Sequence, residues 1–120
     1  MAVTIDASTV PCPEPDAATI DLAFHEVLHL VLTATTFHFN DSMAGTFISH
    51  DALGAVVATG RFSNKVSDQG PGFPREAFTA ILTVRGTTVS GAPVFIRLRQ
   101  HVTILPDGTP SSDFVTLSCS

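Results

Sequence analysis

Two histidines and a glutamate near the start of the chain have the spacing of a metallopeptidase motif. His25-Glu26-Val27-Leu28-His29 is an HExxH sequence, which zinc peptidases of the zincin class place on a helix. On a helix, residues four apart stand about 6 Å from each other, so both imidazoles reach one zinc ion while the glutamate activates its bound water. On a strand the same two histidines are about 13 Å apart and cannot share an ion. The motif therefore supports this chemistry only if the segment is helical.

The pattern around the motif favours a strand. Its leucine and phenylalanine side chains fall on one face of an extended backbone, namely Leu22, Phe24, Leu28, Leu30 and Leu32. The segment is rich in β-branched residues and continues into the alternating Thr36–Phe39 without a glycine or proline. A helix is the alternative, because the polar residues also gather on one side of a helical wheel and Asp16 could cap it. A metzincin would have its third histidine at Thr35, so we expect neither zinc nor any other cofactor.

Composition limits the chain to one small domain and excludes several classes of partner. The 120 residues are 44% hydrophobic and 14% charged, with a formal net charge of −5. This is enough apolar material for one core, and the excess of acidic residues argues against nucleic-acid partners. The arginines are spread over several segments, so we expect no basic patch with stacking aromatics of the kind that binds nucleic acid. No apolar run reaches the roughly 20 residues that a membrane span requires.

Seven strand-like segments predict an antiparallel all-β domain. Short alternating segments separated by turn residues are typical of small barrels and sandwiches. Leu22–Leu32 and Val94–Leu105 are long, which favours a small barrel, with a β-sandwich as the alternative. Asn40-Asp41-Ser42 is interpreted as a turn, and Asn64–Arg75, with its glycines and prolines, as a long loop.

The two cysteines lie near the two ends of the sequence. Residues 1–17 have three prolines around Cys12 and are predicted to form an extended arm, followed by the β-domain at 18–120. A bridge from Cys12 to Cys119 would close a loop of about 108 residues and stabilise the fold by roughly 4–5 kcal/mol. The alternative is two free thiols. We favour the bridge, which requires an oxidising compartment, and therefore expect a secreted or extracytoplasmic protein whose signal peptide is absent from this sequence.

Glu26 is the second candidate for chemistry if the segment is a strand. Its carboxylate falls on an otherwise apolar face, where burial would raise its pKa and require a partner. His25, His29 or His101 could complete an acid/base pair with Glu26 inside a barrel. This is the enzymatic hypothesis, and the catalytic candidates are these four residues.

The sequence favours a non-enzymatic binding domain over this enzyme. Long alternating strands and a low charge content are typical of a barrel that takes a small apolar molecule, or of a domain that binds a protein surface. The loop at Asn64–Arg75 would rim the mouth of the barrel, with Phe73 on it. Arg97 and Arg99 share a strand and could pair with Glu26. The ligand-binding candidates are therefore Glu26, Phe73, Arg97 and Arg99, while the oligomeric state stays open.

Part of the chain resembles a group of uncharacterised small exported actinobacterial β-domain proteins. The likeness rests on Phe24-His25-Glu26 and the segment after it, on Thr59–Asn64, on Ala77–Thr87 and on a last hairpin that ends in Cys119. It extends over residues 20–119, implies an exported β-domain, and carries over no catalytic residue. A second FHE-like element of that group would stand where this chain has Phe95-Ile96-Arg97, so a role shared by two such elements is not implied here.

Overall fold

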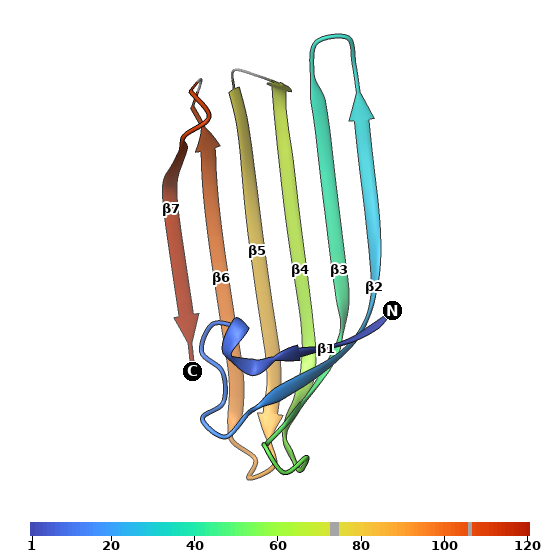
Figure 1. The fold of residues 1–120 in the computed structure, drawn as a ribbon, viewed down its shortest axis with the longest axis vertical. Coiled ribbons are helices and arrows are strands. Elements are labelled where there is room, and N and C mark those ends of the chain that lie inside the picture. The colour runs from blue at the N-terminus through green and yellow to red at the C-terminus, as the bar shows by residue number, and fades with distance from the viewer. Residues whose placement is uncertain (73–74, 106) are drawn as a thin grey trace.

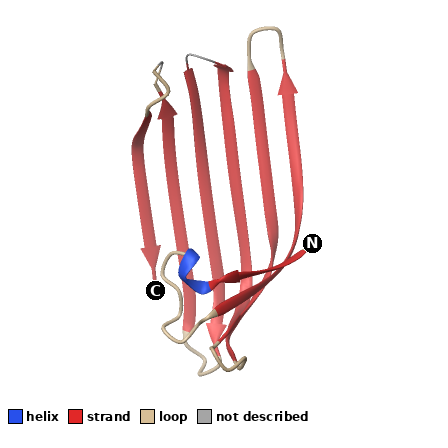
Figure 2. Cartoon of the chain, viewed as in Figure 1, coloured by secondary structure: helices blue, strands red, loops and turns tan. Residues whose placement is uncertain are grey.

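The computed structural model of the chain consists of seven strands and one short 3-10 helix (Figure 1) and describes residues 1–72, 75–105 and 107–120. Nearly all of the described chain is extended (Figure 2). The helix, η1, covers Ala7–Thr9. The strands are β1 (Ala2–Asp6), β2 (Thr19–Leu32), β3 (Phe37–His50), β4 (Val56–Gly72), β5 (Arg75–Thr88), β6 (Pro93–Ile104) and β7 (Pro110–Cys119).

The strands form one antiparallel sheet in which each pairs with its neighbours in sequence, in the order β1 to β7. The predicted all-β class and the single antiparallel domain of seven strands are confirmed. The predicted closure into a barrel is wrong, because β1 pairs with β2 alone and β7 with β6 alone among the described residues. The described strands all belong to one sheet, so among them there is no second layer of a sandwich. No helix in the described residues is long and apolar enough to span a membrane.

Two segments interpreted as irregular are strand instead. Asn40-Asp41-Ser42 lies in the middle of β3, where it pairs with β2 on one side and β4 on the other. Most of the expected loop at Asn64–Arg75 belongs to β4, which pairs with both neighbours as far as Gln69. Partners on both sides satisfy the backbone groups of these residues, and this pairing outweighs their local preference for turns. Phe73 lies outside the described residues.

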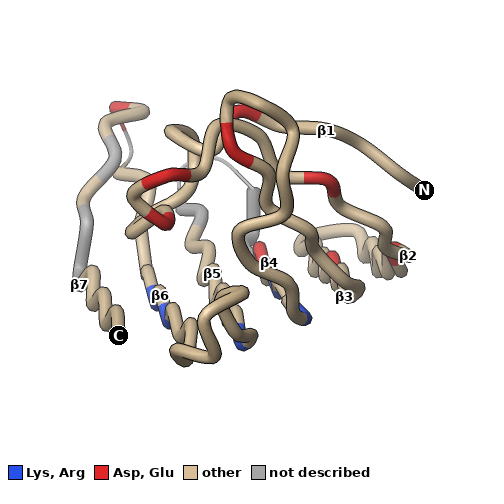
Figure 3. The backbone as a smooth tube through the Cα atoms, turned by 90° about the horizontal axis from the view of Figure 1, so that it is seen from below, with Lys and Arg blue, Asp and Glu red and all other residues tan. Residues whose placement is uncertain are grey.

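Alternation gives the sheet an apolar inner face and a polar outer face. Directly opposed residues of neighbouring strands point to the same face, so Leu22, Phe47 and Gly60 share the inner face through their pairing. Buried residues of this face pack around Phe47, together with Ala7 of the arm. Figure 3 shows the arm lying over one side of the curved sheet.

Glycines let the strands approach closely at the covered end of the inner face. Gly60 and Gly86 are directly opposed on β4 and β5, and the ring of Phe47 lies over both. A Cβ at Gly86 would lie 2.9 Å from that ring. At Gly45 a Cβ would collide with the backbone of β2, at the carbonyl of Ala23. The lower parts of β2 and β3 run diagonally there (Figure 1), and side chains at these positions would block that path.

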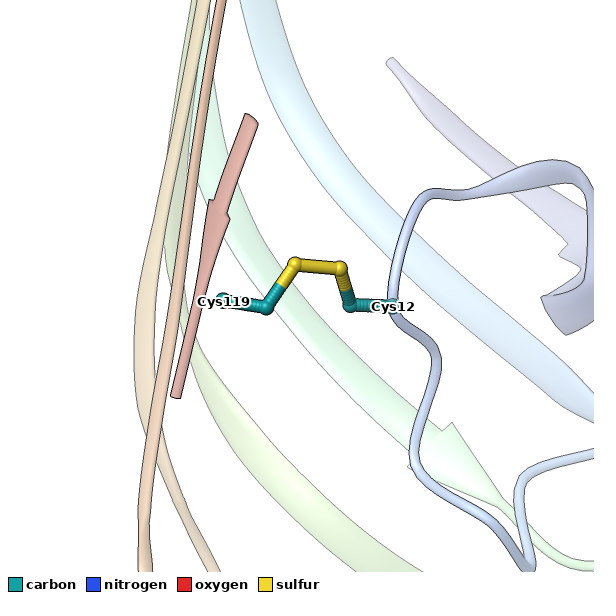
Figure 4. The surroundings of a disulfide bond; sticks show 2 residues. All are labelled: Cys12 and Cys119. Atoms are coloured by element: carbon teal, nitrogen blue, oxygen red, sulfur yellow. A yellow bond between two sulfur atoms is a disulfide. The ribbon is translucent and has the colours of Figure 1, made fainter. Parts of the chain in front are cut away.

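A disulfide and a small polar cluster fasten the arm. Cys12 is bonded to Cys119, with their Cα atoms 6.3 Å apart (Figure 4), so the predicted bridge is confirmed. The sequence predicted that residues 1–17 form an extended arm without regular structure. The first part of this arm, which is rich in β-branched residues, instead forms the strand β1. The Thr4 hydroxyl donates to Asp21 at 2.6 Å, and this bond is the main reason that the pKa of Asp21 is lowered. A disulfide is compatible with an extracytoplasmic location.

Candidate functional site

The HExxH sequence lies entirely within β2, so the predicted strand is confirmed. Alternation places His25 and His29 on the outer face and Glu26 on the inner face. The two histidines are four residues apart on an extended chain, or about 13 Å. This geometry does not form the zincin site, which needs both imidazoles on one ion. Among the described residues, no group of three or more histidine, cysteine or acidic side chains is arranged to hold a metal.

Glu26 lies on the opposite side of the sheet from the partners that the sequence suggested. His101 is on the outer face, where its Nδ1 is 2.7 Å from Oγ1 of Thr79. Arg97 and Arg99 point to that same outer face, four and two residues before His101 respectively. The sheet therefore separates Glu26 from all three, as it does from the two histidines of β2.

Glu26 instead forms a pair of carboxyl groups with Asp41, which we call the acid pair. Asp41 lies on β3 opposite Leu28, on the inner face. The hydrogen bond between the two carboxyl groups raises the pKa of Glu26, and partial desolvation and the charge of Asp41 contribute in the same direction although Glu26 is exposed. Oδ1 of Asp41 is buried and has no hydrogen-bond partner among the described residues. The acid pair therefore presents acceptor oxygens on an apolar surface.

A cavity of about 200 Å³ lies between the arm and the inner face. The arm closes one side of it with Ile5 and the segment Val10–Glu14. Among the described residues that line it, Glu14, Ser49 and Asn64 are the polar ones. The sheet contributes mainly large apolar side chains, among them Leu22, Met43, Phe47, Phe62, Leu82 and Val84. Such a lining is typical of a site for an apolar molecule.

The acid pair lies at the rim of this cavity. Glu26 is directly opposite Met43, which lines the cavity, and Asp41 is two residues from Met43 on the same face. Burial on the inner face decreases away from the arm, since Ile20 is 8% exposed and Leu28 is 61% exposed. The cavity is thus covered at the arm end, and the surface beyond the acid pair is open.

The outer face carries a basic surface, which we call the basic face. It holds five of the six basic residues of the chain, and all five are exposed: Arg61, Lys65, Arg85, Arg97 and Arg99. Figure 3 colours basic positions blue along the strands, and the strand pairing places these five side chains on the face of β4, β5 and β6 opposite the arm. No acidic residue among the described side chains of β3 to β6 points to this face. The arginines come from several strands, as the sequence indicated, but a period of two on neighbouring strands collects them on one face.

Comparison with protein-family models, curated proteins and solved structures finds no match to this chain. Its own fold and site therefore define its class, an open antiparallel sheet with an arm-covered apolar cavity. Sequence reasoning missed Asp41, because it lay in an apparent turn, and Met43 and Phe62 as cavity residues. The alternation of β3 and β4 was the signal that could have placed all three on the inner face.

Proposed function

We propose that this protein is an extracytoplasmic, non-enzymatic binding domain that takes a small apolar molecule in the cavity beneath the arm. The observation that carries the proposal is a cavity of about 200 Å³ with almost entirely apolar walls. A cavity of about 150 Å³ with such walls is large enough for benzene. The site therefore suits a small ring system or an acyl chain of medium length. The disulfide holds the arm over the bound molecule.

The polar groups around the cavity select the head group of the ligand. The acid pair at the rim and Glu14 in the wall offer oxygens that accept hydrogen bonds. A hydroxyl or an amine can donate to these oxygens, whereas a carboxylate would be repelled by them. We therefore expect an apolar alcohol or amine to bind better than the corresponding fatty acid.

Tryptophan reporters on the two faces test this function. The chain has no tryptophan or tyrosine, so Phe62→Trp places the sole indole at the cavity, and Phe95→Trp is the matched control on the outer face. We expect 10-bromo-1-decanol to quench the Phe62→Trp emission saturably and to leave Phe95→Trp unchanged. 10-Bromodecanoate should bind about tenfold more weakly, a difference of about 1.4 kcal/mol. Equal quenching of both variants, or none of either, would overturn the proposal.

A second candidate function is binding of an acidic protein surface by the basic face. Arg61 and Arg85 are directly opposed, an arrangement of like charges that destabilises a sheet. Arg85 also lies over the ring of Phe95, 5.4 Å from its centroid, which holds the guanidinium in one place. An acidic patch on a partner would relieve the repulsion, and the net charge of −5 restricts such binding to this face.

Binding to poly-L-glutamate at low salt tests the second candidate. The double variant Arg61→Ser/Arg85→Ser should lose about tenfold in affinity. The control Ser90→Glu/Thr109→Glu changes the net charge by the same amount in two turns and should lose little. Equal losses in the two variants would mean that net charge alone governs the binding, and the basic face would not be a site.

A further inference from the structure

One edge of β2 is open beyond the residues that β1 covers. β1 pairs with Thr19–Ala23. Met1 then exchanges two backbone hydrogen bonds with Phe24, of 2.8 Å and 2.9 Å. In the part of the chain that the structure describes, no strand continues along this side of His25–Leu32, although β3 pairs with the other side throughout. The HExxH sequence thus lies on a long edge of the sheet.

The open edge presents backbone donors and acceptors in a regular row. In an antiparallel ladder, alternate residues direct both their N–H and their C=O to the same side. Phe24 directs both toward Met1, so Glu26, Leu28, Leu30 and Leu32 direct theirs outward along the same edge. Successive residues of this row are about 6.8 Å apart. An extended strand of another chain complements it.

This edge lacks most of the features that keep edge strands apart, and its one acidic side chain is Glu26. Natural edges are protected by lysine, by proline or by a bulge, and His25–Leu32 contains none of these. Its large apolar side chains are between 46% and 70% exposed, on both faces of the strand: Val27, Leu28, Leu30, Val31 and Leu32. Pairing with another strand would cover both the row of polar groups and these side chains.

We propose that the open edge of β2 pairs with the same edge of a second copy, antiparallel about a two-fold axis at His29. Two identical strands related by a two-fold axis run antiparallel, and each offers the other the same row of backbone donors and acceptors. In this register Glu26 faces Leu32 of the second copy and Leu28 faces its Leu30. The backbone N–H and C=O groups of all four residues along the open edge then form hydrogen bonds with the second copy. A register centred on Leu28 would place Leu32 opposite Phe24, whose groups are already bonded to Met1. The dimer continues the apolar inner face across both copies, and it does not depend on the proposed ligand.

Sedimentation velocity of the full chain tests the dimer. The wild type should sediment as a discrete dimer at micromolar concentration, and Leu30→Pro should be monomeric with an unchanged far-ultraviolet circular dichroism spectrum. The N–H of Leu30 points outward, so proline there removes no bond within the chain. The control Leu30→Ala keeps this N–H and should still dimerise. A monomeric wild type would overturn the proposal, and so would an open-ended series of oligomers, which head-to-tail pairing of β2 with β7 would produce.

A charge pair tests the register and does not depend on proline. About the axis at His29, Val27 faces Val31 of the second copy, whereas within one strand the two are about 13 Å apart. Val27→Lys/Val31→Lys should weaken dimerisation about tenfold through facing like charges. Val27→Lys/Val31→Glu should restore it to near the wild-type value. Equal dissociation constants for these two double variants would contradict the proposed pairing.

Discussion

Replacing Cys12 with serine will lower the free energy of unfolding by about 4–5 kcal/mol, since the bridge closes a loop of more than a hundred residues. The cysteines are separated by 107 positions, and the bond limits the unfolded chain over almost its whole length. The arm has few other long-range attachments among its described residues, chiefly its pairing with β2 and the bond from Thr4 to Asp21. Urea unfolding followed by far-ultraviolet circular dichroism measures the loss.

The control for this effect is the double variant Cys12→Ser/Cys119→Ser. Both substitutions remove the same bond, so the double variant should be no less stable than either single variant. Each should also bind 10-bromo-1-decanol more weakly, because Cys12 and its neighbours form one wall of the cavity. A loss of less than about 1 kcal/mol in all three variants would mean that the bridge contributes little to the fold.

Gly45→Val will destabilise the protein by about 3 kcal/mol or more, the upper range for an overpacked site. A Cβ at Gly45 would meet the carbonyl oxygen of Ala23 and would lie 2.7 Å from the Cα of Phe24. These are backbone atoms of β2, so they cannot move away as a flexible side chain could. The substitution forces β2 away from β3 at the covered end of the sheet, where the cavity lies.

Ala44→Val is the matched control for Gly45→Val. Ala44 precedes Gly45 on the same strand, but it points to the outer face between His25 and Ser63. We expect this valine to change the free energy of unfolding by less than about 0.5 kcal/mol, as surface substitutions usually do. Chemical denaturation of both variants under the same conditions makes the comparison. Similar stabilities would show that β2 and β3 are not closely apposed at Gly45.

Strand alternation made much of the fold predictable. The hydrophobic side chains of Leu22–Leu32 identified β2 and placed Glu26 on the apolar face, and the terminal cysteines identified the bridge. The breaks in the pattern were misleading. Asn40-Asp41-Ser42 has the composition of a turn, yet neighbours on both sides hold it in β3. Whether a segment of turn-like composition becomes a strand depends on the strands that lie on either side of it. The local sequence does not identify those neighbours.

The same limit explains the errors at the site. The apolar setting of Glu26 suggested a partner with the opposite charge, and Arg97 and Arg99 were the available candidates. Which face of β6 meets which face of β2 depends on the register through four intervening pairings. That register places the arginines on the outer face and brings Asp41 beside Glu26 instead. The position of the arm over the cavity could not be predicted either, because it depends on the disulfide and on the pairing of β1.

Titration of methyl-labelled protein with 1-decanol, followed by nuclear magnetic resonance, tests most directly whether the arm-covered inner face is a binding site. The methyl resonances of Met43, Leu82 and Val84, which line the cavity, should shift together and saturate. Those of Val27 and Val31, which are exposed on the outer face, should stay in place. Unshifted cavity methyl groups at saturating decanol, or equal shifts on both faces, would contradict a binding site beneath the arm.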